Sequence, residues 1–269
     1  METKIIKITN FLSDYLKTTS FKGYVIGLSG GIDSALSASL AVKAIGKENV
    51  HGIILPCTYN GERSRTEDIN DAIKLAESLN IDYIIIKLDN SAQSIYEQLS
   101  KLENTNKMIS SNIKARLRMT TIRAYAESRK CLVLGTTNKT EEYLGYYTKA
   151  GDGGAGVDIE PIADLFKYEV FEMARQLGNI PNGIISRIPS AGLFDDQTDE
   201  DEIGITYSEI DRYLELRERE YMQYIKLPKY ERLEWNYKNY NFDDKIVEKI
   251  ENMIVNNNHK RENPPYCKL

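Results

Sequence analysis

A glycine turn followed by an acidic residue is the strongest chemical signal in the sequence. Ser29-Gly30-Gly31-Ile32-Asp33-Ser34 stands between an apolar run and a stretch with helical spacing. Paired glycines let the backbone turn tightly and present successive N–H groups, and the helix that follows adds its positive end, so the turn can cradle phosphate oxygens. Asp33 can hold Mg²⁺, because this ion favours one or two carboxylates plus phosphate oxygens. The alternative is an ordinary helix start, in which Asp33 or Ser29 only caps backbone donors.

The turn differs from two common nucleotide-binding patterns. No lysine follows its glycines, so it is not the G-x-x-x-x-G-K-[ST] loop, and its spacing is not the G-x-G-x-x-G of dinucleotide-binding folds. These differences argue against an enzyme that transfers the γ-phosphoryl group in the usual way.

The elements that must position this turn are short strands and longer helices in alternation, which predicts βαβ units. Each expected strand is a continuous apolar run, as a strand covered on both faces requires; these are residues 23–28, 50–55, 83–88 and 131–134. We expect an α/β fold with a doubly wound parallel sheet of about five strands flanked by helices. Ligands of such sheets collect beyond the carboxyl ends of the strands, where the glycine turn, Asp89 and residues 135–138 follow three of them.

Three helices are expected from periodicity. Ile69, Ala72, Ile73, Ala76 and Leu79 form one clear helical stripe. A long helix is expected over about 105–129, with an inward face of Ile109, Ile113, Leu117 and Ala124 and a polar face of Asn112, Arg116 and Arg123. The first residues have charged and polar side chains at helical spacing, which indicates an amphipathic helix rather than a signal peptide.

The chain is expected to form one unit over residues 1–269. Within it, residues 1–165 would form an α/β nucleotide-binding core, and residues 166–269 a helical extension that begins with a helix over 166–177. No repeat and no Pro/Gly/Ser linker divides the two parts.

Composition excludes several functional classes. Forty acidic against 35 basic residues give a net charge of −5, which argues against a general nucleic-acid binder. The only histidines, His51 and His259, are too few and too far apart for a histidine-based zinc site or a Ser-His-Asp triad. Three cysteines without C-x-x-C spacing suit reduced thiols in a cytoplasmic protein, and no apolar run is long enough to cross a membrane.

The glycine turn resembles the pyrophosphate loop of the N-type ATP pyrophosphatases, several of which amidate or thiolate their substrates. Seven further blocks, in order, resemble the successive signatures of the ammonia-dependent NAD synthetases: residues 112–119, 134–141, 145–154, 161–167, 189–193, 197–200 and 259–261. The match extends from Gly27 to Pro265, nearly the whole chain.

The resemblance implies a two-step amidation. ATP adenylylates the nicotinate carboxylate of deamido-NAD and releases pyrophosphate, and ammonia then displaces AMP to give NAD. The first step needs positive charge around the triphosphate, for which the resemblance implies Mg²⁺ held by Asp33 and Glu141, with Lys167 nearby. The second step needs a carboxylate that binds ammonium and accepts a proton, and the resemblance points to Asp152.

Other roles follow from the same resemblance. The expected ATP contacts are Gly27, Leu28, Ser29, Gly30, Gly31, Ile32, Asp33, Ser34, Thr136, Lys167 and Ser190. The expected deamido-NAD contacts are Arg116, Lys149, Asp158, His259 and Lys260. Two more residues than in the commoner family spacing separate the glycine pair at 153–154 from Asp158. The acidic run 195–202 would be part of a segment that closes over the nucleotide, and the dinucleotide would lie across the interface of a homodimer.

Two other functions stay open. Another pyrophosphatase-type ligase, forming GMP or modifying tRNA, would share the glycine turn but not the later blocks. A nucleotide sensor without catalysis would share the fold, although it would not need Asp33, Glu141 and Asp152 together.

Overall fold

Helices and short parallel strands alternate through the first half of the computed structural model, which describes residues 1–58, 66–101, 107–190, 198–221, 240–262, 265 and 267. The four strands are β1 (Tyr24–Gly27), β2 (Val50–Ile54), β3 (Asp82–Ile85) and β4 (Leu132–Val133). Helix α1 (Glu2–Lys17) precedes the first strand. The helices between the strands are α2 (Ile32–Ile45), the 3₁₀ turn η1 (Lys47–Asn49), α3 (Thr66–Leu79), α4 (Asp89–Leu99) and α5 (Lys107–Arg129).

The second half is almost entirely helical. Its elements are α6 (Lys139–Leu144), η2 (Gly154–Gly156), α7 (Lys167–Leu177), α8 (Asn182–Ile185), α9 (Asp199–Ile203), α10 (Tyr207–Leu216), the π-turn η3 (Arg217–Tyr221), α12 (Asp244–Asn256) and α13 (Asn258–Arg261). Among the described residues, no helix combines the length and the apolar character that crossing a membrane requires.

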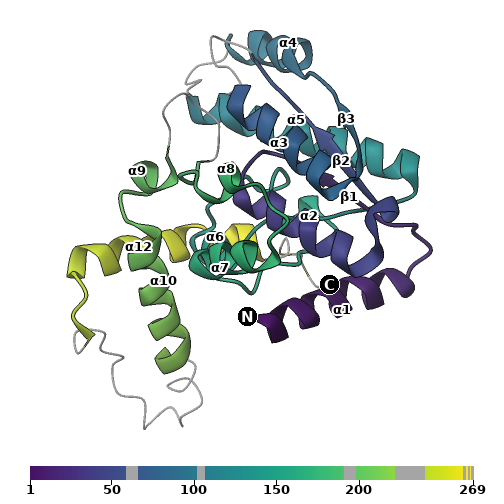
Figure 1. The fold of residues 1–269 in the computed structure, drawn as a ribbon. Helices are drawn as coiled ribbons and strands as arrows, with labels where there is room; N and C mark the ends of the chain where they lie inside the picture. Colours follow the sequence, from purple (N-terminus) through teal and green to yellow (C-terminus); the bar gives the residue numbers. More distant parts are fainter. Residues whose placement is uncertain are drawn as a thin grey trace.

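The sheet is parallel, with the strand order β3-β2-β1-β4. Successive side chains of β1 point to opposite faces, so Tyr24 and Ile26 pack with α1, α2, α3 and α7, whereas Val25 packs with α4 and α5. Helices therefore cover both faces (Figure 1), and the doubly wound α/β fold expected from the sequence is confirmed.

The sheet has four strands among the described residues instead of the five expected. A single parallel bridge between Leu134 and Ile159 occupies the position where another strand would extend the sheet beside β4. Pro161 follows closely and has no N–H to donate, so the pairing does not continue.

The inward face of α5 also differs from the expected one. Ile113 is buried as expected, but Ile109 and Ala124 are exposed. The face that packs on the sheet is instead made by Ala115, Met119, Ile122 and Ala126. Asn112 and Arg123 lie on a polar side as expected, and both are bonded to the segment that follows β4.

A third hydrophobic cluster holds the C-terminal helices together. Its buried members come from α6, α9, α10 and α12 and include Leu144, Ile203, Tyr213 and Ile250. In Figure 1, α10 and α12 lie beside α6 and away from the sheet. Because α6 follows β4 directly, this cluster is attached at the carboxyl edge of the sheet, where the glycine turn also lies.

Candidate active site

The glycine turn connects β1 to α2 and is held by its two serines. Ser29 Oγ lies 3.0 Å from Ser34 Oγ and accepts a hydrogen bond from the Gly31 N–H at 3.2 Å. The Ser34 hydroxyl donates to the Gly31 carbonyl at 2.9 Å. Gly31 is the N-cap of α2, and no side chain caps the helix there. The positive end of α2 therefore faces the cleft without a protein carboxylate as its cap.

Gly30 is required at its position for two reasons. Its φ of +81° lies in the left-handed region that favours glycine. A Cβ on Gly30 would also stand 2.3 Å from the Asp68 carbonyl oxygen, closer than any contact allows. The start of α3 is thus packed directly against the backbone of the turn.

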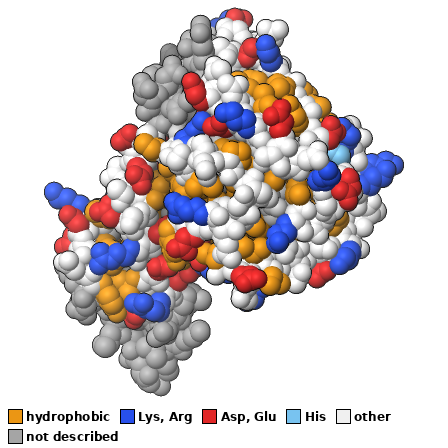
Figure 2. Space-filling model, viewed as in Figure 1, with side chains coloured by type: hydrophobic (Ala, Val, Ile, Leu, Met, Phe, Trp, Pro, Cys, Tyr) orange, Lys and Arg blue, Asp and Glu red, His pale blue; other side chains and the backbone are white. Residues whose placement is uncertain are grey.

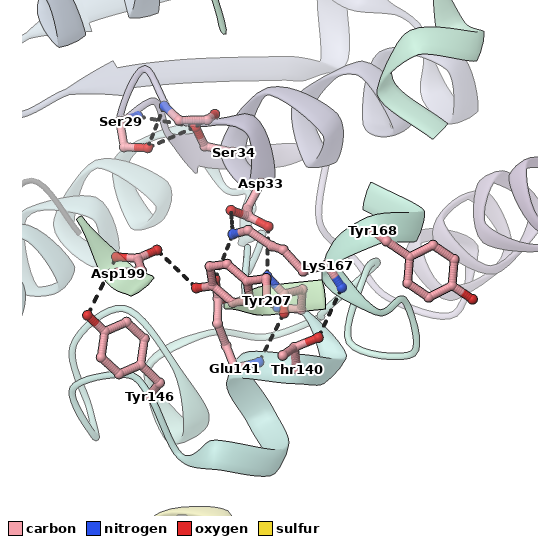
Figure 3. Close-up of polar contacts among 12 residues, drawn as sticks. Ser29, Asp33, Ser34, Thr140, Glu141, Tyr146, Lys167, Tyr168, Asp199 and Tyr207 are labelled. Atoms are coloured by element: carbon pink, nitrogen blue, oxygen red, sulfur yellow. Dashed lines mark hydrogen bonds and ion pairs between the residues drawn. The ribbon is translucent and has the colours of Figure 1, made fainter. Parts of the chain in front are cut away.

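Asp33, Glu141 and Lys167 meet beside the turn, although they come from three different helices (Figure 3). The Lys167 ammonium donates to Asp33 Oδ2 at 2.7 Å and to Glu141 Oε1 at 3.0 Å. Asn138 completes the arrangement, since its side-chain amide donates to Asp33 Oδ1 at 2.8 Å. Asn138 and Glu141 also form the capping box that starts α6.

Charge and burial oppose each other in this cluster. Desolvation by burial raises the pKa of Glu141 to about 8, although the Lys167 ammonium works in the opposite direction. Burial disfavours the charge of Lys167 as well, but Asp33 and Glu141 outweigh it and raise the lysine pKa. Two carboxylates held beside a phosphate-binding turn fit Mg²⁺, which takes hard oxygen ligands and shares them with phosphates.

A second layer of polar residues supports Lys167, and sequence reasoning did not identify it. The Lys167 ammonium lies 4.9 Å from the centre of the Tyr207 ring, and the Tyr207 hydroxyl donates to Asp199 Oδ2 at 2.9 Å. The Lys167 backbone N–H donates to the Thr140 hydroxyl, which in turn donates to the buried Asp211. These contacts join residues far apart in the chain and leave no local pattern.

All the residues expected to bind ATP except Lys167, which is buried behind Asp33 and Glu141, line one cleft at the carboxyl edge of the sheet. The turn residues from Gly27 to Ser34 line it, and Thr136 and Ser190 lie on its other walls. Gly27 permits close approach of α5, because a Cβ there would stand 2.9 Å from an Ile122 methyl group. Residues 195–197 of the expected closing segment lie outside the described residues.

Asp152 lines the same cleft. Its carboxylate accepts a hydrogen bond from the Thr148 N–H at 2.7 Å. Desolvation by the surrounding protein raises the pKa of Asp152, and this hydrogen bond only partly offsets the effect. A carboxylate with a raised pKa is better suited to accept a proton during a reaction.

Three of the expected dinucleotide contacts, Lys149, His259 and Lys260, lie close together and form what we call the dinucleotide corner. The Lys149 ammonium donates to the His259 carbonyl. The Lys260 ammonium donates to the carbonyls of Gly145 and Tyr147 at 2.6 and 2.9 Å. Burial lowers the pKa of Lys260, while Asp152 acts in the opposite direction. The tail therefore folds back onto the loop that carries Asp152.

Arg116 and Asp158 lie apart from that corner. Arg116 is exposed on α5. Both oxygens of Asp158 have structural partners, because Oδ1 accepts from Arg123 and Oδ2 from the Val133 N–H, each at 2.7 Å. The Asp158 carboxylate therefore lies between β4 and α5, and Asp158 does not line the cleft.

Comparisons with known proteins agree on one family. The family model described as NAD synthase matches residues 4–264. The NH(3)-dependent NAD(+) synthetase of Methanococcoides burtonii is 46% identical over 209 residues, which are 77% of this chain and 76% of that protein. The structure of NMN synthetase from Francisella tularensis has a TM-score of 0.83 at 35% identity and covers 100% and 98% of the two chains. The NH3-dependent NAD synthetase from Campylobacter jejuni, in complex with the nitrate ion, has a TM-score of 0.77 at 28% identity and covers 99% of both.

The family model spans nearly the whole chain, and the two similar structures share its fold over nearly the full length of both chains. The chain belongs to the NAD synthase family.

Proposed function

We propose that this chain is an ammonia-dependent NAD synthetase, which amidates deamido-NAD with consumption of ATP. The observation that carries the proposal is the meeting of Asp33, Glu141 and Lys167 beside the glycine turn. This arrangement places two carboxylates and one buried ammonium next to a phosphate-binding backbone, and the family match supports the same chemistry.

In the first step the nicotinate carboxylate attacks the α-phosphorus of ATP, and the bond to the β-phosphate breaks. The backbone N–H groups at the start of α2 and the hydroxyls of Ser29 and Ser34 bind the pyrophosphate that leaves. Asp33 and Glu141 would hold Mg²⁺, which neutralises charge that develops on the phosphates. Lys167 keeps the two carboxylates in place and adds positive charge.

In the second step ammonia attacks the carbonyl carbon of the acyl adenylate, and AMP leaves. Ammonium predominates at neutral pH, so one proton must be removed before nitrogen can attack. Asp152 binds the ammonium and accepts this proton, a role supported by its raised pKa and its position in the cleft.

The dinucleotide binds at the corner where Lys149, His259 and Lys260 lie together. In the family pattern Arg116 belongs to this site and reaches the ligand from an exposed position on α5, whereas the bonds of Asp158 to Arg123 and Val133 support a structural role for its carboxylate.

A homodimer would cover surface that the isolated chain exposes. Ile85 and Ile95 are 46% and 38% exposed, and Met108 at the start of α5 is 49% exposed. Figure 2 shows hydrophobic side chains gathered on the side of the molecule where β3 and α4 lie. The three cysteines do not form disulfides with one another, which supports a cytoplasmic location.

A second candidate substrate is the mononucleotide deamido-NMN. It is favoured by the similarity to the structure of NMN synthetase from Francisella tularensis. Both substrates carry the same nicotinate carboxylate, so the residues of the two chemical steps would serve either one.

Competition between the two substrates tests the proposal. The purified protein is supplied with ATP, Mg²⁺, ammonium and equal amounts of deamido-NAD and deamido-NMN. NAD as the main product, with AMP and pyrophosphate in equal amounts, supports the proposed function. NMN as the main product would assign the second substrate, and the absence of both amides would reject the activity.

A further inference from the structure

Arg187 forms a clamp between the two sides of the ATP cleft. Its guanidinium donates from Nη1 to Asp68 Oδ1 and from Nη2 to Asp71 Oδ2. Both carboxylates lie in the first turns of α3, three residues apart and so on the same face. One planar guanidinium therefore bridges two carboxylates on a neighbouring helix, a geometry that lysine cannot reproduce.

Each end of the clamp is attached to the nucleotide cleft. On one side, the Asp68 backbone touches Gly30 of the glycine turn. On the other side, Arg187 directly precedes Ile188, Pro189 and Ser190, which line the opposite wall. The Pro189 carbonyl also accepts a hydrogen bond from the Asp199 N–H at 3.1 Å, and Asp199 is the residue that holds Tyr207 beneath Lys167.

Arg187 also offsets part of the negative charge that Asp68 and Asp71 place near the glycine turn. Asp68 and Asp71 have side chains only 22% and 10% exposed, and they stand beside a turn that must accept polyphosphate. Without Arg187, two carboxylates poorly screened by solvent would repel the triphosphate.

We propose that Arg187 is a positioning residue for ATP: it fixes α3 against the glycine turn and offsets part of the negative charge of Asp68 and Asp71. The inference rests on the proposed function, because it takes ATP as the ligand of the cleft. Arg187 acts through the turn and the wall that it holds, so its loss weakens ATP binding without affecting the dinucleotide corner.

The chain provides two matched controls. Lys74 donates to the same Asp71 at 3.3 Å from an exposed position, but it does not connect α3 to the opposite wall. The Ser78 hydroxyl also connects α3 to the chain before Arg187, because it donates to the Asn179 carbonyl at 2.8 Å. This bond lies at the end of α3 that is remote from the glycine turn. Lys74→Gln therefore removes charge without breaking the clamp, and Ser78→Ala removes a connection that lies far from the phosphates.

The test measures the Kd of Mg-ATP and of deamido-NAD by calorimetry for the unmodified chain and for Arg187→Gln, Asp71→Asn, the double variant and the two controls. We expect Arg187→Gln to weaken ATP binding about tenfold and to leave the Kd of deamido-NAD unchanged. Asp71→Asn weakens one of the two bonds but also removes one negative charge near the triphosphate, so it should cause a smaller loss. The double variant should bind ATP no more weakly than Arg187→Gln, because both substitutions break the same clamp.

Three results would overturn the inference: unchanged ATP binding by Arg187→Gln, equal losses for ATP and deamido-NAD, or losses of the same size in the controls. If Arg187→Gln does not fold, Asp71→Asn, whose side chain keeps its shape, tests the same contact. Failure of the unmodified chain to bind ATP would instead overturn the proposed function, so the first titration separates the two.

Discussion

Replacing Lys167 with methionine should destabilise the protein strongly, because it leaves two carboxylates without their shared cation. The Lys167 side chain is 2% exposed and bonds to Asp33 and Glu141 at 2.7 and 3.0 Å. Removing one partner from a buried ion pair costs about 3–5 kcal/mol. Because the two carboxylates remain 19% and 16% exposed, we expect the lower end, about 3 kcal/mol, or a fall in Tm of roughly 6–12 °C.

The measurement is urea unfolding of the variant and of Lys139→Met as a matched control. Lys139 also bonds to two carboxylates, but one of them, Asp164, is 97% exposed and the other, Glu218, is 31% exposed. Its loss should cost about 1 kcal/mol or less. Mg²⁺ at ten times its Kd for the variant should stabilise Lys167→Met by about 1.4 kcal/mol, and it should stabilise the unmodified chain less, because there Lys167 already pairs with both carboxylates. A variant as stable as the control, or one that Mg²⁺ does not stabilise, would refute the reasoning.

Three further substitutions test other parts of the structure. Gly30→Ala places a methyl group 2.3 Å from the Asp68 carbonyl oxygen and should reduce ATP affinity, measured by titration, at least about tenfold. The control is Gly178→Ala, which is also at positive φ but has open space around it. This variant should be less stable but should bind ATP as the unmodified chain does. Asp158→Asn should lower the free energy of unfolding by about 1–3 kcal/mol and leave the KM for deamido-NAD unchanged, because its carboxylate binds Arg123 and Val133; a KM effect without a stability effect would restore the dinucleotide role. Burial raises the pKa of Asp211 to about 6, so the folded state binds more protons than the unfolded state between about pH 4 and 6, and the contribution of Asp211 to stability falls by roughly 2–3 kcal/mol as pH rises through that range. Asp211→Asn should remove this fall in urea unfolding curves, and identical pH profiles for both proteins would contradict the assignment.

Local sequence patterns were sufficient to predict the glycine turn and helix α3. The glycine turn was located correctly because Gly30 can adopt the positive φ that this tight turn requires, and α3 because its buried residues recur at helical spacing. The predicted inward face of α5 was wrong at Ile109 and Ala124, because polar residues are buried along this helix. Ser110, Ser111 and Lys114 are all buried, so hydrophobic spacing does not identify the face that packs.

The site could be predicted only in part. Asp33 followed from the turn itself, whereas Glu141 and Lys167 came from family resemblance and from no local pattern. The contacts of Tyr207 with Asp199 and of Arg187 with Asp71 had no signal at all, because each depends on how distant helices pack. The dinucleotide role of Asp158 stays a prediction from the family resemblance, and no local pattern indicated the partners of its carboxylate, Arg123 and the Val133 N–H.

The most direct test of the proposed chemistry follows the oxygen atoms of the nicotinate carboxylate. The protein converts deamido-NAD labelled with ¹⁸O in that carboxylate, in the presence of ATP, Mg²⁺ and ammonium. The ¹⁸O content of AMP and of pyrophosphate is then measured by mass spectrometry. If the glycine turn binds the departing pyrophosphate and the carboxylate attacks the α-phosphorus, one ¹⁸O atom appears in AMP and none in pyrophosphate. Label in inorganic phosphate, with ADP as the nucleotide product, would contradict attack at the α-phosphorus and the role of the turn.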